Sequence, residues 1–211
     1  MLLRAPQPPN LPLAPGQYAA QYHEQLNNVL RLYFNQVSNV EGALLAPLGG
    51  KYLNNPYAAI QHTTDKTFTA NTATQITFDQ NDYLNGCAND GTDGIAVTIP
   101  GIYNYQFSVQ LKNTDTQIHS SWIWLRVDGV DVAGTGSKFD VTAKHGGVDG
   151  FIIAACNFYV QLNALNTVEM WAAVDNTAIT FDATGASTSP FAMPAIPSVV
   201  ATLSFVSSIP T

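Results

Sequence analysis

The sequence predicts an all-β sandwich that is preceded by an extended proline-rich arm and one α-helix. Three observations support this prediction. Residues 102–111 alternate apolar and polar side chains with a period of two, the pattern of a half-buried strand. From residue 67 onward, short strand-like runs are separated by polar turns. Before that point, a stretch with five prolines at 5–15 leads into helical spacing.

The strand expected at 102–111 has the clearest alternation in the chain, and the rest of the head is predicted around it. The Pro100–Gly101 step before it cannot continue a strand and therefore marks where it begins. We expect its apolar face to enter the core and its polar face to meet water or a partner. The apolar face consists of Tyr103, Tyr105, Phe107, Val109 and Leu111.

Further stretches have the length and composition of strands, and Asp128–Gly129 between two of them is a two-residue hairpin turn. Short strands joined by polar turns are typical of a sandwich or barrel, and their number suits a jelly roll. These strands are expected at about 73–79, 94–99, 118–127, 130–134, 151–162, 167–175, 178–182 and 197–207.

Two of these strands are apolar on both faces. One face of each is assigned to the core: Ile123, Leu125 and Val127 in the first, and Ile152, Ala154, Cys156, Phe158, Val160 and Leu162 in the second. The opposite faces hold Trp122 and Trp124 in the first, and Phe151, Ile153, Ala155 and Tyr159 in the second. A sandwich needs only one apolar face per strand, so the surplus predicts that the chain forms oligomers.

Residues 1–15 are predicted to be an extended arm, because prolines at this density forbid a helix. Such a terminus is either disordered or a docking arm. Leucines alternate with the prolines, and an apolar tip of this kind suits a groove on another protein. In the docking interpretation, the contacts are made by Pro8, Pro9, Leu11 and Leu13.

Residues 16–41 are expected to form an α-helix with a seam over three heptads, the spacing of a coiled coil. The seam comprises Tyr22, Leu26, Val29, Tyr33 and Val40. The helix either packs on its own domain or joins copies of the chain in a bundle. We favour the bundle, because the sandwich already closes its own core. Residues 42–66 have little periodicity and are predicted to be a linker, which leaves 67–211 for the head.

The composition limits the classes of partner. Charged residues make up only 11% of the chain, against about 25% in an average protein. A surface that is polar through amides and hydroxyls is less costly to bury against a neighbour than a charged one. A net charge of −7 without clustered Lys or Arg argues against nucleic acid. No stretch is long enough to span a bilayer, and no apolar signal sequence follows Met1, so we expect assembly in a cytoplasm.

No arrangement of residues for catalysis stands out. The histidines share no ligand spacing, and neither His-Glu-x-x-His nor Gly-x-Ser-x-Gly occurs. Residues 134–138 lack the spacing of a phosphate loop. A loop at 79–93 is rich in Asp and Asn, which leaves calcium binding open, although the spacing is not that of an EF-hand. Cys87 and Cys156 form no disulfide framework, and Cys156 is expected to be a buried thiol. We predict no enzyme activity, no catalytic residue and no cofactor.

The Pro-Gly-x-Tyr-x-x-x-Phe motif at 100–107 resembles a strand opening in the globular head of complement proteins, which is a jelly roll of the tumour-necrosis-factor type. Residues 73–79, 122–130 and 166–171 resemble other strands of that family, so the similarity covers 67–208. The resemblance implies a trimer. On that basis Trp122, Trp124 and Tyr159 are expected at the trimer interface or on the outer face of the head, and the helix in a trimeric bundle.

The order of arm, helix and head resembles virion proteins of tailed bacteriophages, as do residues 11–18 leading into 30–36. Secreted complement-like proteins place Gly-x-y repeats before the head, and this chain has none. The resemblance implies a capsid decoration or cement protein on the capsid exterior, bound to the major capsid protein or another virion protein. The alternative is the head of a fibre or adhesin that binds a host glycan or receptor. A carbohydrate-active enzyme is a weaker third interpretation.

Overall fold

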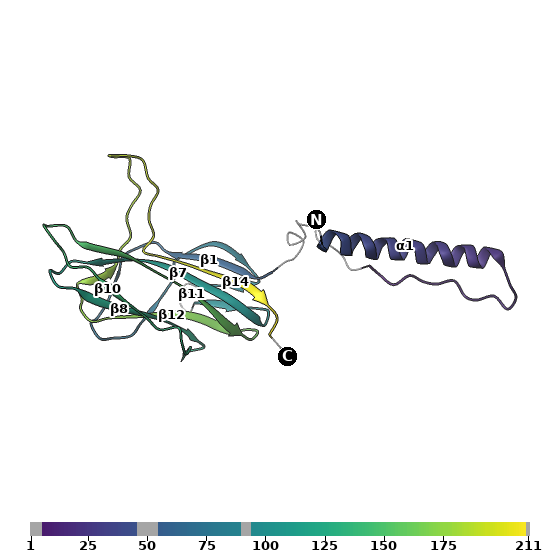
Figure 1. Ribbon diagram of the computed structural model, residues 1–211, viewed down its shortest axis with the longest axis horizontal. Coiled ribbons are helices and arrows are strands. Elements are labelled where there is room, and N and C mark those ends of the chain that lie inside the picture. Colours follow the sequence, from purple (N-terminus) through teal and green to yellow (C-terminus); the bar gives the residue numbers. More distant parts are fainter. Residues whose placement is uncertain (1–5, 46–54, 90–93, 210–211) are drawn as a thin grey trace. The chain divides into compact units, whose positions relative to one another are not determined.

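The computed structural model describes residues 6–45, 55–89 and 94–209. The chain divides into two compact units, residues 1–54 and residues 55–211. The first unit contains helix α1 (Ala20–Leu45), and the second contains the strands. In the first unit, the extended segment before α1 runs back along the helix (Figure 1).

The predicted helix is confirmed, but it begins and ends four residues later than the expected 16–41. Its first turn opens at Ala19, whose carbonyl accepts a hydrogen bond from the backbone N–H of Tyr22. The helix continues past Gly42, which is exposed. A glycine at such a position costs only about 1 kcal/mol relative to alanine, so it need not end a helix.

The second unit is a sandwich of two antiparallel sheets, as the sequence predicted, and it is consistent with a jelly-roll-like fold (Figure 1). Sheet A consists of β1 (Tyr57–His62), β2 (Lys66–Thr67), β4 (Gln80–Asn85), β7 (Gly101–Asn113), β11 (Gly150–Leu162), β13 (Ile179–Phe181) and β14 (Val199–Ser207). Sheet B consists of β3 (Thr74–Ile76), β5 (Cys87–Ala88), β6 (Ile95–Val97), β8 (His119–Val127), β9 (Val130–Asp131), β10 (Ser137–Val141) and β12 (Thr167–Val174).

The strand order places most spatial neighbours far apart in sequence. Sheet A runs β4–β1–β14–β7–β11, and β13 joins β7 beyond the end of β14 and pairs with β2. Sheet B runs β10–β8–β12, with β6 and β3 both paired to the far side of β12. Strand β5 pairs antiparallel with β6, on the side away from β12. Strand β9 forms the predicted hairpin with β8. The left-handed backbone of Asp128 (φ 49°) and Gly129 (φ 78°) makes that two-residue turn.

Strand β7 is the centre of sheet A. It pairs with β11 over its whole length, from Gly101 opposite Leu162 to Asn113 opposite Gly150. Along its other edge, β7 pairs first with β14, at residues 102–109, and then with β13, at residues 111–113. The face predicted to enter the core is buried throughout, at Tyr103, Tyr105, Phe107, Val109 and Leu111.

The two strands that are apolar on both faces orient as predicted. On β8, Ile123 and Leu125 are fully buried, whereas Trp122 is exposed. On β11, Ala154 and Val160 are buried in the core. The remaining core-facing residues of these strands are buried or half-buried: Val127, Ile152, Cys156, Phe158 and Leu162.

Glycine is required where β7 begins. A Cβ atom added to Gly101 would lie 2.4 Å from the Phe205 ring and 2.8 Å from the Ser207 carbonyl oxygen. Both distances are shorter than any real carbon contact, so a side chain here would displace the end of β14. The Pro–Gly step therefore marks the start of β7 and also allows β14 to approach it closely.

The expected linker over 42–66 is wrong in two places. Residues up to Leu45 belong to α1, and β1 already begins at Tyr57, ten residues before the expected start of the head. The central residues 46–54 lie outside the described part of the chain. Strand β1 was missed because its pairing is non-local: it lies between β4 and β14, the last strand of the chain.

The loop expected at 79–93 contains strand structure, which is a second correction. Residues 80–85 form β4 and 87–88 form β5. Strand β4 is polar because it is an edge strand of sheet A and buries little. Its identity as a strand comes from backbone pairing with β1 rather than from its own side chains. For the same reason β10, which pairs with β8, was not expected from residues 137–141.

Core and surface substitutions on β8 should differ clearly in how much they lower the free energy of unfolding. Replacing Leu125 with alanine should lower the free energy of unfolding by about 2–5 kcal/mol, because it removes fully buried methyl groups and leaves a cavity. Trp122→Ala is the control, since the Trp122 side chain lies outside the core. Urea unfolding followed by far-ultraviolet circular dichroism, at one chain concentration, measures both. Equal losses would show that the two faces of β8 have been assigned in reverse.

Candidate interaction surfaces

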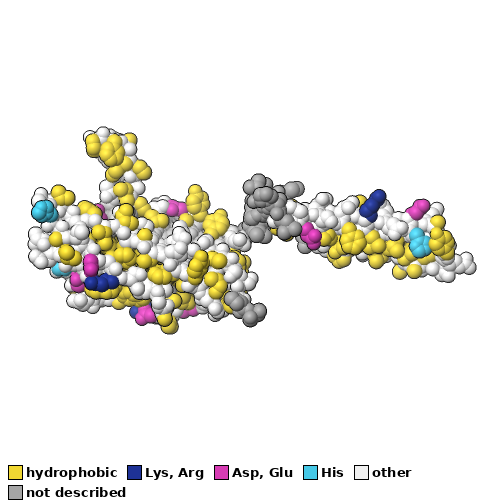
Figure 2. All heavy atoms as spheres, in the orientation of Figure 1, with side chains coloured by type: hydrophobic (Ala, Val, Ile, Leu, Met, Phe, Trp, Pro, Cys, Tyr) yellow, Lys and Arg dark blue, Asp and Glu magenta, His cyan; other side chains and the backbone are white. Residues whose placement is uncertain are grey.

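The charged side chains of the head are distributed unequally between its two outer faces. In Figure 2 they gather mainly where β8, β10 and β12 of sheet B lie in Figure 1. Strands β11 and β14 contain no charged residue, and β7 contains only Lys112, near its end. Lys112 is neutralised by an ion pair of 2.8 Å with Asp182. The middle of the outer face of sheet A is therefore uncharged.

Strand β11 forms a raised apolar edge on this uncharged face. Its outward side chains Phe151, Ile153 and Tyr159 define what we call the β11 ridge, and Ile153 and Tyr159 are 65% and 67% exposed. Among the described residues, β11 pairs with β7 only, so its other edge is unpaired. Long exposed strand edges and contiguous exposed apolar patches are both uncommon in a soluble monomer.

A shallow hollow of about 540 Å³ lies beside the ridge. Its floor is made by short or uncharged side chains of three adjacent strands of sheet A, β14, β7 and β11. We call it the central hollow, and its lining on this face comprises Gln106, Ser108, Ala155, Asn157, Val200 and Thr202. The face thus combines a projecting apolar edge with an uncharged depression next to it.

The outer face of sheet B carries a cluster of three tryptophans, Trp122, Trp124 and Trp171. Trp124 on β8 lies directly opposite Trp171 on β12. The guanidinium of Arg126 lies 4.0 Å from the centre of the Trp171 ring, a cation–π contact. We call these three residues the tryptophan cluster.

Carboxylates hold this cluster in place. The indole N–H of Trp124 donates to Asp131 at 2.7 Å, and that of Trp171 donates to Glu169 at 2.7 Å. Asp131 also accepts a bond of 2.6 Å from Arg126. The bond from Arg126, followed by that from Trp124, holds the pKa of Asp131 below its ordinary value. Trp122 is the most accessible member, with 38% of its surface exposed.

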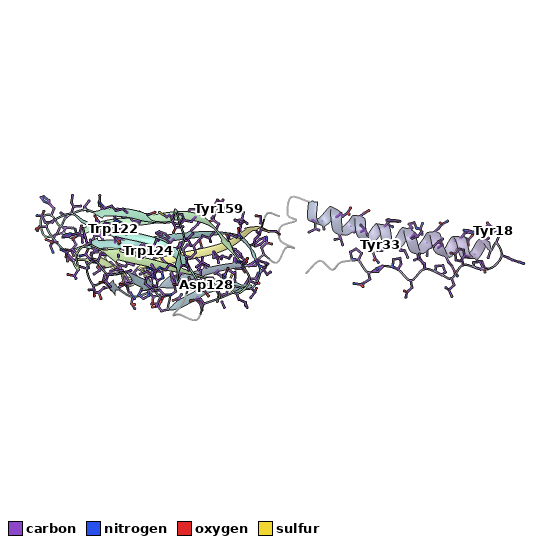
Figure 3. All side chains as sticks on the ribbon, turned by 90° about the horizontal axis from the view of Figure 1, so that it is seen from below. Tyr18, Tyr33, Trp122, Trp124, Asp128 and Tyr159 are labelled. Carbon is purple, nitrogen blue, oxygen red and sulfur yellow. The ribbon has the colours of Figure 1, made fainter. Side chains whose placement is uncertain are left out.

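The structure separates three residues that the sequence prediction grouped together. Trp122 and Trp124 project from β8 on the outside of sheet B, and Tyr159 projects from β11 on the outside of sheet A (Figure 3). They therefore belong to two different surfaces. Their common assignment was based on alternation within single strands, which shows that a residue points outward but not which sheet it belongs to.

In the N-terminal unit, the seam of α1 is covered in part by the chain itself. The five seam residues are all half-buried: Tyr22, Leu26, Val29, Tyr33 and Val40. Tyr33 lies on the side of α1 that the extended segment follows (Figure 3). Pro6, Pro9 and Pro12 of that segment are half-buried at every third position, the period of a polyproline helix.

The residues assigned to docking divide into two kinds. Pro9 is half-buried, whereas Pro8, Leu11 and Leu13 are exposed. Leu13 is 96% exposed, so the unit itself gives this side chain no apolar neighbour. The extended segment thus uses its prolines against α1 and leaves its leucines accessible.

Two histidines of the head, His119 and His62, have polar partners. The Nε2 atom of His119 lies 2.9 Å from the Asp115 carboxylate and its Nδ1 atom lies 3.5 Å from the Asp175 carboxylate, so both ring nitrogens face carboxylates rather than a nucleophile. The bond to His119, followed by that to the Thr116 N–H, holds the pKa of Asp115 below its ordinary value. His62 lies 3.3 Å from the hydroxyl of Thr64, but no carboxylate orients its other ring nitrogen.

The described part of the chain contains no group of three or more His, Cys, Asp or Glu side chains placed to hold a metal ion. In the segment considered for calcium, Asp79 accepts hydrogen bonds from the backbone and hydroxyl of Thr63. Asp82 accepts from Gln61 and Gln80. Asp90 and Asp93 lie outside the described residues.

Among the helices of the described residues, none has the length and apolar character needed to cross a membrane. Cys87 and Cys156 are both free thiols. Cys156 faces the core but is half-buried rather than fully buried, and its sulfur lies 3.4 Å from the Ser137 hydroxyl.

No protein-family model matches the chain, and no curated protein matches it.

Cys87 should react slowly with alkylating reagents at neutral pH. Burial raises the pKa of its thiol to about 11, because the partly buried site disfavours the thiolate. In Cys156→Ser protein, the alkylation rate of Cys87 with iodoacetamide should therefore keep rising as the pH increases from 7 to about 11. Mass spectrometry at timed intervals measures the rate. A rate that levels off near pH 9 would contradict the assignment.

Proposed function

We propose that this protein is a non-enzymatic structural protein of a virion: a homotrimeric capsid decoration or cement protein anchored through its N-terminal arm and helix. The observation that carries the proposal is the uncharged outer face of sheet A, with the β11 ridge beside the central hollow. It is supported by the expected relationship to tailed-phage virion proteins and to tumour-necrosis-factor-like trimers.

The first step of the argument concerns the cost of burying this face. Charged side chains lose several kcal/mol when they are taken out of water, so a face that forms a stable contact favours neutral side chains. Strands β7, β11 and β14 provide amides, hydroxyls and apolar groups, and the cation Lys112 on this face is already paired with Asp182. Desolvating this face against another protein is therefore inexpensive, and the β11 ridge gains by it.

The second step concerns geometry. The ridge side chains and the lining of the hollow are at different fixed positions on the outer face of one chain, so one copy cannot fill its own hollow with its own ridge. If the ridge of one copy packs against the hollow of the next, the contact joins two different surfaces. Repetition of such a contact closes into a ring when the rotation allows it. The finer fold assignment, a tumour-necrosis-factor-like jelly roll, favours a ring of three.

The third step concerns the N-terminal unit. Leu11 and Leu13 project from a segment that is already extended and restricted by proline, so fixing it in a groove costs little entropy. Three arms on one trimer bind together, and linkage raises the apparent affinity by orders of magnitude without new contacts. A capsid lattice, with its repeated grooves, is a suitable partner for such an arm.

A second candidate function is supported by the tryptophan cluster. In a trimer built on sheet A, the outer face of sheet B would remain accessible, with Trp122 partly exposed beside the side chains of Lys138 and Asp140. Aromatic faces beside polar groups are suited to bind sugar rings. This favours a fibre head or adhesin that recognises a host glycan. Binding of the full chain to a glycan array that is lost in Trp122→Ala would favour this function over cement.

The trimer is tested by placing a charge on the ridge. Ile153→Glu should convert the protein from about three times 22.7 kDa to a single chain, because a carboxylate would be buried in the contact without a partner. The matched control is Val130→Glu, a β-branched residue of similar exposure on sheet B. Sedimentation velocity at micromolar concentration measures the mass. A wild-type monomer, or a trimer that tolerates Ile153→Glu, would count against the proposed contact.

The anchoring role is tested on particles that lack the protein. The double variant Leu11→Ser, Leu13→Ser should lose most of its retention after washing, because both exposed side chains are removed while the prolines stay on α1. Deletion of residues 1–15 should have at least the same effect, and Leu165→Ser, an exposed leucine of the head, is the control. Bound copies are counted by quantitative mass spectrometry. Undiminished retention of the double variant would assign the contact to the head.

A further inference from the structure

A two-stranded ribbon at residues 183–197, between β13 and β14, projects away from the sandwich (Figure 1). We call it the finger. Two pairs of backbone hydrogen bonds hold its strands together. Thr184 and Ile196 exchange bonds of 2.9 and 2.8 Å, and Ser187 and Met193 exchange bonds of 3.1 and 2.9 Å.

The composition of the finger is unusual for a projecting element. No charged residue occurs anywhere from 183 to the end of the chain. Near its tip Phe191 is 65% exposed, and Pro190, Ala192 and Met193 are its neighbours in sequence. Figure 2 shows hydrophobic side chains gathered at the outer end of the finger.

Such an element gains little stability by itself. A two-stranded ribbon in water is marginally stable at best, and this one has two bonded pairs, of which Thr184 with Ile196 lies at its root. Solvent-exposed hairpin tips normally carry polar or charged residues, whereas this tip exposes a phenylalanine. A contact that covers Phe191 would remove this apolar surface from water and would also hold the ribbon in one conformation.

The root of the finger identifies the side of the head from which it rises. Thr184 and Ile196 line a hollow of about 370 Å³ together with Gln110, Phe151, Ile152, Ile153 and Asp182. Gln110 and Ile153 point outward from sheet A, and Phe151 and Ile153 belong to the β11 ridge. The finger therefore begins on the same uncharged face as the ridge and the central hollow.

We propose that the finger is an intersubunit clasp that packs its apolar tip on the outer face of sheet A of a neighbouring copy of this chain. This inference rests on the proposed trimer, whose contact surface it extends. The occupant is a second copy because the finger is continuous with that surface at its root and because both partners are neutral. A finger directed to a capsid groove would have no reason to share the ridge.

The clasp is tested by photo-crosslinking in the full-length protein. Phe191 is replaced with the photoreactive analogue p-benzoylphenylalanine, and equal amounts of ¹⁴N and ¹⁵N protein are unfolded and reassembled together. After irradiation, mass spectrometry should find pairs in which a ¹⁴N peptide containing residue 191 is joined to a ¹⁵N peptide from β7, β11 or β14. The same analogue at Val130 is the control and should give few such pairs.

The rate of subunit exchange between trimers provides a second test of the clasp. Phe191→Ser should leave the trimer assembled at micromolar concentration but should speed the exchange of subunits between labelled trimers by about tenfold, since loss of an aromatic contact mainly raises dissociation rates. Thr188→Ser, a polar substitution in the same finger, is the matched control and should exchange at the wild-type rate.

The outcomes separate this inference from the proposed function. If the wild-type protein sediments as a monomer, the proposed trimer fails and the clasp fails with it. If it is a trimer whose crosslinks from position 191 stay within one chain, the clasp alone is overturned. If crosslinks form only on particles and join residue 191 to another virion protein, the finger is a capsid contact and the clasp is likewise overturned.

Discussion

The head depends on the pairing of β7 with partners along both of its edges. Its five inward side chains, from Tyr103 to Leu111, can be buried only if β11 and β14 flank them and sheet B covers them. The full-length contact with β11 brings a second apolar strand into sheet A. Because side chains alternate along a strand, the residues of β11 that complete the core force the others outward. Alternation thus fixes that Phe151, Ile153 and Tyr159 point outward, whereas their apolar character, unlike that of Asn157 and Gln161 on the same face, is a feature of the sequence.

The two outer faces of the sandwich differ in how their exposed aromatic and apolar side chains are partnered. On sheet B, Trp124 and Trp171 are held by Arg126, Asp131 and Glu169, so the indole N–H groups of these two tryptophans are satisfied within one chain. On sheet A, the Lys112 ammonium lies 5.9 Å from the centre of the Phe151 ring, whereas the exposed side chains of Ile153, Tyr159 and Phe191 have no charged partner among the described residues. The first arrangement suits a surface that remains in water. The second suits a surface that another chain covers. For that reason we assign the contact of the proposed trimer to the outer face of sheet A.

Sequence periodicity predicted the strands whose own side chains are buried, and it missed those that exist through pairing. Strand β7 follows from alternation over many residues, and strand β11 follows from a long run that is apolar on both faces. Strand β4, which is polar and lies at an edge, and strand β1, which lies between β4 and the last strand, have no comparable signal. The same limit applies to the candidate surfaces. Exposure of Trp122 and Tyr159 was predictable, but their location on opposite sheets was not.

By itself, the sequence determined the all-β sandwich, the single N-terminal helix, the orientation of β8 and β11 and the scarcity of charge, because each depends on local spacing or composition. Only the tertiary structure decided that uncharged side chains from β7, β11 and β14 meet on one face, that the finger rises beside the ridge, and that the proline segment lies along α1. These contacts join residues up to about a hundred positions apart, and no local pattern records which strand will be the neighbour of which.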